Sequence, residues 1–321
     1  MIPQLVDASS LAALKACAKK YNLAYKQGYR PMGRSIHLHF GAAISSSMET
    51  YREAVFEHNA SNKEAQLLGV RRLISEWQAH EVKEQGNKTL NQCIQAFTRY
   101  TYEFPAREDI YQPYEDIEKP WEFSFAIPLE DFPYHPSGEP FIFAGRFDLA
   151  VKDRSGLIAP LDEKTTASMS TNWPEQWSLR FQFLGYCWAL NRLGFKSRSA
   201  VVRGICPLKH STKFATAEPR YPKYLLDRFE HNLQFMLEEL LTYHEREEAS
   251  LPQPWPYNFS ESCTAYGGCD FADICFLKSQ KSFLDNNYSI KHWNPLSRIP
   301  PEEPVDWSVV EELMQKAKQN D

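Results

Sequence analysis

The sequence lacks three features that would assign it at once to a familiar class. No apolar run approaches the roughly 20 residues of a membrane-spanning helix. The opening MIPQLVDASS has no basic segment followed by an apolar one, as a secretory signal peptide would. Positive charge is not in excess, since the net charge is −5, and this disfavours extended non-specific binding to nucleic acid. We therefore expect a cytoplasmic protein that has no contact with a membrane.

What is present describes a globular protein of ordinary composition. Hydrophobic residues make up 43% and charged residues 24% of the 321 positions, enough for one large domain or two of common size. Disulfides are not expected among the seven cysteines, because the cytosol is reducing. Three cysteines near the C-terminus, Cys263, Cys269 and Cys275, are separated by five residues each. Such grouping favours ligation of a metal or cluster.

A predicted β-hairpin is the most informative stretch. Residues 141–152 and 157–165 have the composition of two strands, and the Asp-Arg-Ser-Gly between them has turn chemistry. The length of the connecting loop decides whether Asp148 lies opposite Leu161 or opposite Asp162. In either register the two aspartates lie close to each other across the hairpin.

Two carboxylates and an amine are expected to meet on this hairpin. Asp162 and Lys164 share a face of their strand, because side chains alternate, while Glu163 points away. Mg²⁺ prefers such oxygen ligands, and Mn²⁺ is similar; the backbone carbonyl of Glu163 could add one more. An ion bound there, with Asp148 as a further ligand, would lower the pKa of a water molecule. Lys164 could then position that water or stabilise negative charge on a phosphate.

A helix predicted over 173–193 follows the hairpin. Gln182 and Tyr186 are four residues apart and therefore lie on one face of it. An amide and a phenol one turn apart could bridge the lysine, the water and a phosphate. Arg180 is near enough in sequence to meet the same phosphate. Two tryptophans at the start of this segment could stack on unpaired bases or pack against the helix.

The ordered set GRFD, LDEKT and QFLGY resembles the PD-(D/E)XK nuclease superfamily, and in particular its RecB-like branch. That branch includes CRISPR-associated exonucleases and phage recombination exonucleases. The resemblance implies an α/β fold with a restriction-endonuclease-like core, in which a mixed sheet is flanked by helices. It also implies that Asp148 and Asp162 bind metal, that Lys164 is catalytic, and that Gln182 and Tyr186 support the site.

The function implied by this resemblance is Mg²⁺- or Mn²⁺-dependent hydrolysis of DNA by an exonuclease that acts on single-stranded ends. Recombination, repair, phage replication or CRISPR adaptation would be the setting, with a recombination or helicase protein as partner. Two alternatives remain open. The chain could be a binding module that recognises DNA or a partner protein and whose nuclease site has decayed, or it could be a nuclease that acts on RNA.

Upstream of the hairpin, the chain both follows and departs from the family pattern. A strand predicted over 121–129 carries Glu122, which could be a supporting carboxylate. A helix predicted over 42–58 follows Gly41, and the family commonly has a metal-binding histidine four residues after this glycine. Ser45 stands there instead, so a histidine ligand is not expected.

The cysteines extend the resemblance. Iron–sulfur members of the RecB-like branch take one cysteine from far upstream and three from near the C-terminus. Cys17 fits the upstream position, and Cys263, Cys269 and Cys275 fit the others, with Cys263 three residues from its usual spacing. We expect these four to hold a structural [4Fe–4S] cluster that joins the two ends of the chain. Zinc in a tetrahedral Cys₄ site is the runner-up, and free thiols are the remaining alternative.

Further helices are predicted from apolar periodicity. One of them, 62–82, has an apolar stripe at Leu67, Val70, Ile74 and Trp77. The other predicted helices are 7–27, 89–102, 224–247 and 307–318. A strand is predicted over 199–206, and 209–222 is predicted to be irregular. Gly267 and Gly268 would let the backbone wrap closely around a ligand.

Four regions follow from these patterns. They are a helical N-terminal region that contributes Cys17 (1–104), the nuclease core (105–250), a cysteine-cluster element (251–285) and a tail with a short helix (286–321).

Overall fold

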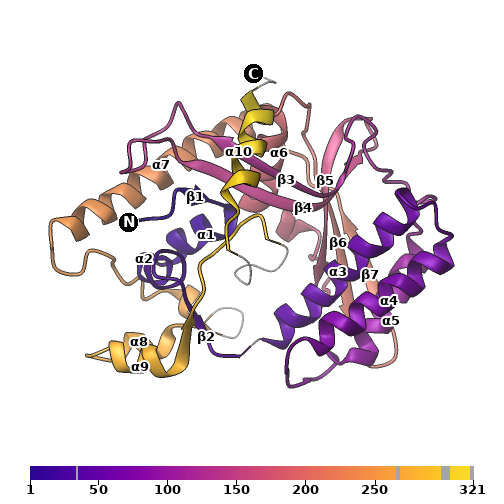
Figure 1. Cartoon of the computed structure of the whole chain (residues 1–321), viewed down its shortest axis with the longest axis horizontal. Helices are drawn as coiled ribbons and strands as arrows, with labels where there is room; N and C mark the ends of the chain where they lie inside the picture. Colours follow the sequence, from indigo (N-terminus) through magenta and orange to yellow (C-terminus); the bar gives the residue numbers. More distant parts are fainter. Residues whose placement is uncertain (34, 265–267, 298–303, 319–321) are drawn as a thin grey trace. The chain divides into compact units, whose positions relative to one another are not determined.

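The computed structural model describes residues 1–33, 35–264, 268–297 and 304–318 (Figure 1). The chain forms two compact units, and each is assembled from separate segments. The terminal unit consists of Met1–Met32, Phe125–Gly145 and Asp227–Asp321. The central unit consists of Gly33–Ser124 and Arg146–Leu226. The four regions drawn from sequence stay a prediction.

The described part of the central unit begins with three α-helices, continues with three strands, and ends with one α-helix and two strands. They are α3 (Ile36–Phe56), α4 (Asn62–Gln78), α5 (Leu90–Glu103), β3 (Trp121–Pro128), β4 (Ile142–Lys152), β5 (Ile158–Thr165), α6 (Phe181–Arg192), β6 (Val201–Pro207) and β7 (Thr212–Ala217). β3 and β4 each run through the boundary between the two units.

A mixed sheet organises the central unit. β5 lies antiparallel to β4 and parallel to β6, and β6 lies antiparallel to β7. Leu149 pairs with Leu161, so the same register continued places Asp148 opposite Asp162. This is the second of the two registers that the hairpin sequence allows. β7 forms where the sequence predicted an irregular segment, because residues 212–217 extend the sheet beside β6.

Different helices cover the two faces of this sheet. On one face, Arg52 of α3 and Tyr100 of α5 both bond the Glu163 carboxylate. On the other face, Gln182 of α6 contacts the Asp162 carboxylate. Alternation along β5 thus directs neighbouring residues toward different helices. The α/β class and the mixed sheet flanked by helices are confirmed.

The helices α3, α4 and α5 share a core with Ile205 of β6. The stripe predicted on α4 is wrong in part, since Leu67 is 56% exposed. Ala65, Gly69 and Leu73 are buried in its place. The small residues turn inward because α4 packs closely on its neighbours, and a larger side chain would not fit there.

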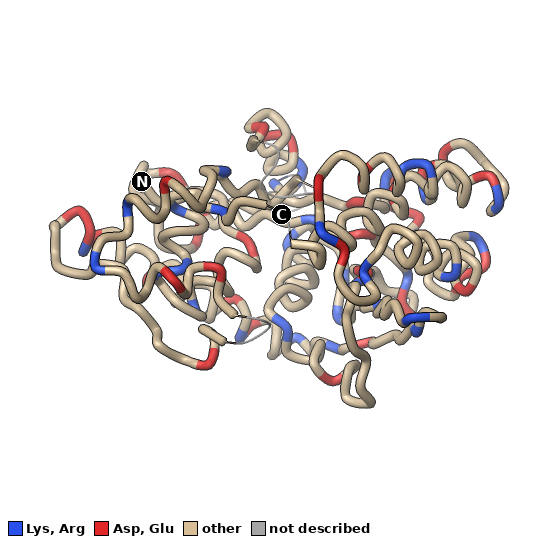
Figure 2. Tube along the Cα trace, turned by 90° about the horizontal axis from the view of Figure 1, so that it is seen from below, with Lys and Arg blue, Asp and Glu red and all other residues tan. Residues whose placement is uncertain are grey.

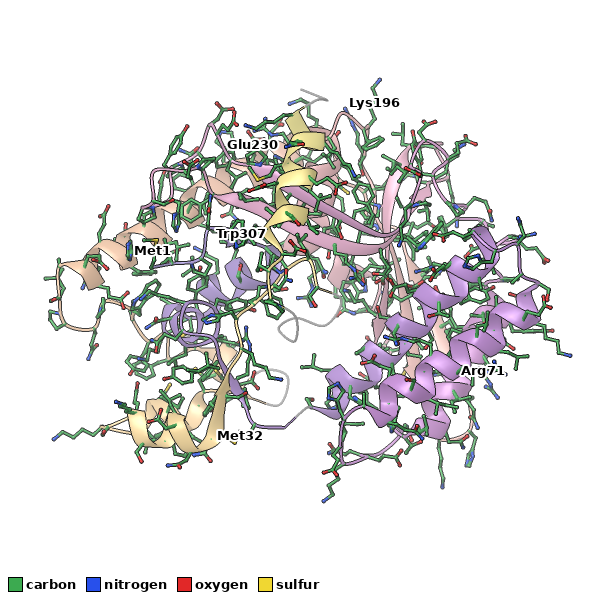
Figure 3. The ribbon with its side chains drawn as sticks, in the orientation of Figure 1. Met1, Met32, Arg71, Lys196, Glu230 and Trp307 are labelled. Atoms are coloured by element: carbon green, nitrogen blue, oxygen red, sulfur yellow. The ribbon has the colours of Figure 1, made fainter. Side chains whose placement is uncertain are left out.

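The terminal unit combines elements from both ends of the chain. They are β1 (Leu5–Val6), α1 (Ala8–Ala16), α2 (Ala18–Tyr21), a π-helical turn (Asn22–Lys26), β2 (Tyr29–Pro31), α7 (Lys223–Glu248), α8 (Ala272–Cys275), α9 (Lys281–Asn287), β8 (Tyr288–Ile290) and α10 (Trp307–Lys318). β2 pairs with β8, and Leu5 of β1 packs with Val310 of α10. Figure 3 marks Trp307 at the start of α10, the helix predicted over 307–318.

The helix predicted over 7–27 is interrupted. Asp7 caps its start, as expected, by accepting hydrogen bonds from the backbone of the first turn. At Cys17 the backbone is extended, with φ −170° and ψ 117°. The Ala16 carbonyl accepts a hydrogen bond from Ser262 Oγ at 3.2 Å, and Lys19 N donates to the Pro256 carbonyl at 3.0 Å. These tertiary bonds replace the helical ones, which no local pattern indicates.

Charged residues of both signs are interspersed along both units, as Figure 2 shows. None of the described helices is at once long enough and apolar enough to cross a membrane.

Gly69→Ala tests the close packing of α4. Alanine favours a helix over glycine by about 1 kcal/mol. A methyl group here would lie 2.3 Å from Cζ of Phe97 and 3.1 Å from the Ser47 carbonyl oxygen. Overpacking costs about 1–3 kcal/mol, so we expect a lower free energy of unfolding in a urea titration.

Gly41→Ala is the matched control, because among the described residues its methyl group would meet only Thr165 Oγ1, at 3.4 Å. This variant should be as stable as wild type or more stable. Equal stability of the two variants would contradict the packing described.

Candidate active site

The two aspartates meet where β4 and β5 leave regular pairing. Asp148 Oδ2 accepts a hydrogen bond from the backbone N–H of Glu163 at 2.6 Å. Lys164 Nζ lies 2.7 Å from Oδ1 of Asp162, which is 5% exposed. The hairpin therefore brings both carboxylates and the amine together, as the alternation of side chains predicts.

The helix α6 is bonded to both strands of the hairpin. Gln182 Nε2 donates to the Tyr186 hydroxyl at 2.7 Å and lies 3.4 Å from Asp162 Oδ2. The Tyr186 hydroxyl donates in turn to the Arg146 carbonyl at 2.7 Å. Because the amide and the phenol are one turn apart on one face, each fixes the other and both border the aspartates.

Electrostatics at the aspartates favour a cation. Burial and the neighbouring Asp162 raise the pKa of Asp148 to about 6, against the opposing effect of Lys164 and Arg52. Two carboxylates with no ion between them repel each other, so a positive charge bound there would stabilise both ionised forms. The donor set of carboxylate and carbonyl oxygens fits Mg²⁺ or Mn²⁺.

Glu122 lies in β3 within electrostatic range of Asp148. Its Oε2 accepts from Arg146 Nε at 2.6 Å, and its side chain is 6% exposed. Oε1 has no hydrogen-bond partner among the described residues. Burial, with Asp148 and Glu49 adding to it, raises the pKa of Glu122 to about 8 against the effect of Arg146. Its φ of +54° is a strained value for a side chain of this size.

Arg180 and the two tryptophans lie at the start of α6. The helix begins at Phe181, later than predicted, so Arg180 precedes it, is exposed and has its guanidinium 5.5 Å from the centre of the Trp177 ring. Trp177 meets Phe183 edge to face. Trp173 is buried against Gly204. A methyl group added to Gly204 would lie 2.5 Å from the Trp173 ring. The tryptophans pack in this structure.

A buried ion pair behind the hairpin was not foreseen from the sequence. Arg52 of α3 pairs with Glu163, and their side chains are 4% and 3% exposed. The Tyr100 hydroxyl donates to the same carboxylate at 2.8 Å. Burial raises the pKa of Glu163 to about 7, with Asp148 adding to it and Arg52 opposing it. The available signal was an arginine among the apolar residues of a predicted helix.

Ser45, which occupies the position of the family histidine, is half-buried in α3. It lies one turn after Gly41, whose backbone passes close to Thr165 at the end of β5.

The cysteines divide between the units. Cys93, Cys187 and Cys206 of the central unit are buried, which is common for free thiols that pack as small apolar side chains. The other four are Cys17, Cys263, Cys269 and Cys275, and all belong to the terminal unit. Burial raises the pKa of the Cys275 thiol, and the proximity of Cys17, Cys269 and Cys263 raises it further.

Spacing within this group of four thiols is wide. Among the described residues, no three cysteine sulfurs lie within 4.8 Å of one another. Sulfurs bound to one tetrahedral zinc ion would be about 3.8 Å apart, given a Zn–S bond of about 2.3 Å. Gly268, with φ of +106°, precedes Cys269 and permits the turn there, while Gly267 lies outside the described residues.

The family model described as the PD-(D/E)XK nuclease superfamily matches residues 7–276. The chain belongs to this superfamily. Its members are nucleases that use divalent metals such as Mg²⁺ or Mn²⁺. The matched range spans the hairpin and α6.

Two solved structures are similar to this chain. One is the crystal structure of a protein from Eubacterium rectale that is provisionally described as an exonuclease, with 12% identity, a TM-score of 0.49, and coverage of 88% of this chain and 92% of that one. The other is SSO0001, with 11% identity, a TM-score of 0.30, and coverage of 75% and 85%. No curated protein sequence matches the chain.

The raised pKa of Asp148 predicts how metal binding depends on pH. The ion binds the ionised carboxylate, so protonation competes with it and affinity falls as pH drops through about 6. One unit below that pKa, the apparent affinity for Mn²⁺ should be about tenfold weaker than its limiting value. Calorimetric titration with Mn²⁺ at a series of pH values, from about 1.5 units above this pKa to about 1 unit below it, measures the apparent affinity.

Asp148→Asn is the control for this titration. It should bind Mn²⁺ weakly and with less dependence on pH. An affinity for wild type that stays constant over the range would exclude Asp148 as a titrating ligand.

Proposed function

We propose that the chain is a divalent-metal-dependent deoxyribonuclease of the RecB-like branch, an exonuclease acting on single-stranded DNA ends. The observation that carries the proposal is the convergence of Asp148, Asp162 and Lys164 on one hairpin, with Gln182 and Tyr186 bonded beside them. The five side chains supply two carboxylates for a metal ion, an amine for charge stabilisation, and an amide and a phenol that hydrogen-bond beside them. Recombination, repair, phage replication or CRISPR adaptation is the proposed setting, with a recombination or helicase protein as partner.

Asp148, Asp162 and the backbone carbonyl of Glu163 would hold Mg²⁺ or Mn²⁺. The ion would supply an acidified water and neutralise charge on the scissile phosphate. Asp148 is oriented by the amide of Glu163, and Asp162 by Lys164 and Gln182. The carboxylates therefore need little rearrangement to bind, which is the advantage of a site fixed by its neighbours.

Lys164 is the proposed catalytic base or electrostatic stabiliser. Its side chain is 28% exposed, so its amine is accessible while it remains paired with Asp162. From there it can orient a water molecule and stabilise negative charge that develops on phosphate. Tyr186 and Gln182 position it indirectly through Asp162. Glu122 is proposed as a supporting carboxylate, and the exposed Arg180 as a phosphate contact.

We also propose a [4Fe–4S] cluster bound by Cys17, Cys263, Cys269 and Cys275. Two observations support it: all four cysteines belong to the terminal unit, and Cys275 is within electrostatic range of the other three thiols. The tertiary bonds at Ala16 already join the two segments that would carry the ligands. The proposed role is structural.

End-labelled single-stranded and double-stranded DNA, incubated with anaerobically purified protein and Mn²⁺ or Mg²⁺, tests the activity. Wild type should cleave only with metal, and the position of the label in the products gives the polarity. Asp162→Asn and Lys164→Ala should each reduce the rate by a factor of at least about 100, in keeping with loss of an acid–base or charge-stabilising group.

A labelled RNA of the same sequence, run in parallel, separates a deoxyribonuclease from a ribonuclease. Retained activity in both variants would exclude this hairpin as the active site. Absence of cleavage by wild type with intact cysteine ligation would instead favour the binding module, whose DNA affinity can be measured directly.

Iron and sulfide content tests the cluster. Anaerobically purified wild type should contain about four irons per chain, the composition of a [4Fe–4S] centre. Cys17→Ser should lose iron and lower the melting temperature, while Cys187→Ser, at a buried cysteine of the central unit, should keep its iron. Stoichiometric zinc without iron would establish the runner-up.

A further inference from the structure

The two strands that carry the aspartates are not held by regular pairing at the site. Among the described residues, the β4–β5 ladder ends at Leu149 and Leu161, one position before the aspartates. The β5–β6 ladder continues to Thr165. Asp148 reaches across with its carboxylate to the Glu163 amide. Some other interaction must fix the separation of β4 from β5 at this point.

Arg52 bonds both strands at the place where their ladder has ended. Nη1 donates to the backbone carbonyl of Asp148 at 3.2 Å, and Nη2 pairs with the carboxylate of Glu163. The first partner belongs to β4 and the second to β5. A planar guanidinium can make both bonds at once with fixed geometry, which an ammonium group cannot.

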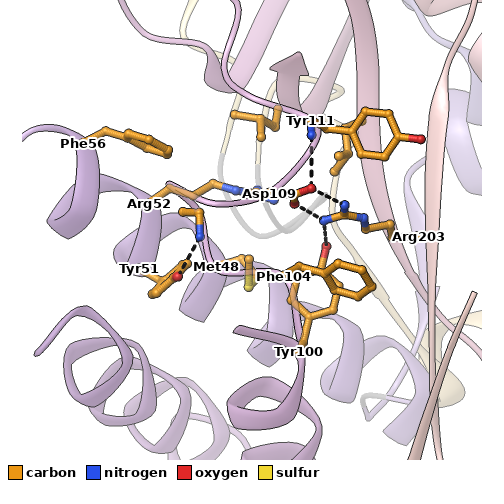
Figure 4. Close-up of a pocket in the computed structure, with 12 residues that line it drawn as sticks. Met48, Tyr51, Arg52, Phe56, Tyr100, Phe104, Asp109, Tyr111 and Arg203 are labelled. Atoms are coloured by element: carbon orange, nitrogen blue, oxygen red, sulfur yellow. Dashed lines mark hydrogen bonds and ion pairs between the residues drawn. The ribbon is translucent and has the colours of Figure 1, made fainter. Parts of the chain in front are cut away.

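Glu163 links Arg52 to β5 from the opposite face of the sheet. Its side chain points to the sheet face opposite Asp162 and Lys164, so it anchors the residue between them without entering the site. Tyr100 donates to the same carboxylate, and Arg203 donates to the Tyr100 hydroxyl at 3.4 Å. Figure 4 shows Arg52, Tyr100 and Arg203 lining one pocket.

The pocket is too small to hydrate these charges. Its volume of about 20 Å³ accommodates about one water molecule. A buried ion pair is weak grounds for stability, because desolvation offsets the attraction between the charges. The geometry of Arg52 instead points to positioning, since its two partners are the carbonyl of one metal-site residue and the side chain of another.

Resting on the proposed function, we propose that Arg52 is a positioning residue that sets the separation of Asp148 from Asp162 for metal binding, with Glu163 as its counter-charge. Arg52 touches neither ion nor DNA. It acts through the backbone of β4 and the side chain of β5.

Arg52→Lys keeps the charge but loses the fork that bonds both strands. Mn²⁺ affinity, measured by calorimetry without DNA, should weaken by about 10- to 100-fold, the usual effect of losing a group that orients a metal ligand. The KM for DNA should not change, because Arg52 is buried. Excess Mn²⁺ should restore kcat in this variant and should not restore it in Lys164→Ala.

Arg203→Lys is the matched control. Arg203 is also 4% exposed and is paired with a carboxylate, that of Asp109. Its backbone pairs with β5 opposite Glu163, but its side chain bonds neither β4 nor β5. Both variants should lower the melting temperature of the metal-free protein, and only Arg52→Lys should lose Mn²⁺ affinity. If Arg52→Lys and Arg203→Lys bound Mn²⁺ with equal affinity, Arg52 would contribute only to stability, and the proposal would be overturned.

The pair of substitutions Arg52→Met with Glu163→Gln guards against misfolding, because it removes both charges and leaves neither buried alone. It too should bind Mn²⁺ weakly, and wild-type affinity would overturn the proposal. A wild type that neither binds Mn²⁺ nor cleaves DNA would refute the proposed function itself. A wild type that does both, beside an Arg52→Lys protein of equal affinity, would refute only the role of Arg52.

Discussion

The hydrogen bond from the Glu163 amide to the Asp148 carboxylate is the constraint on which the central unit depends. It puts a side chain where a strand would ordinarily offer a backbone carbonyl, and the regular β4–β5 ladder ends one position before the two aspartates. A buried charge left alone costs about 3–5 kcal/mol, and three acids near this point are each paired with a cation. The three ion pairs are Lys164 with Asp162, Arg146 with Glu122, and Arg52 with Glu163.

Much of this arrangement follows from local pattern. The hairpin is defined by two strand-like runs and a turn, and alternation along β5 is enough to separate Asp162 and Lys164 from Glu163. The four-residue spacing of Gln182 and Tyr186 is enough to put them on one face of α6. These features could be predicted because each depends on residues close in sequence. The sequence also left two hairpin registers open, because the composition of the turn does not determine the loop length to within one residue.

What the sequence did not indicate depends on distant partners. The break at Cys17 exists because Ser262 and Pro256 take over bonds that a helix would otherwise make. The inward turn of Gly69 reflects the ring of Phe97 on another helix. The sequence shows Arg52 as an arginine in an amphipathic helix. Its two hydrogen-bond acceptors lie about 100 residues downstream. Long-range contacts of this kind have no local signature in the sequence.

The composition of the terminal unit has a consequence for synthesis of the chain. Its first segment ends at Met32, and the strand β2 within that segment pairs with β8 near residue 290. During translation the N-terminal segment therefore leaves the ribosome long before its partners exist. Apolar residues such as Leu23 and Ala24, which are buried against Ile274 in the finished protein, stay uncovered through that interval. Contacts of such sequence separation form slowly, and the N-terminal segment is exposed to aggregation or to chaperones until the residues near 290 are made.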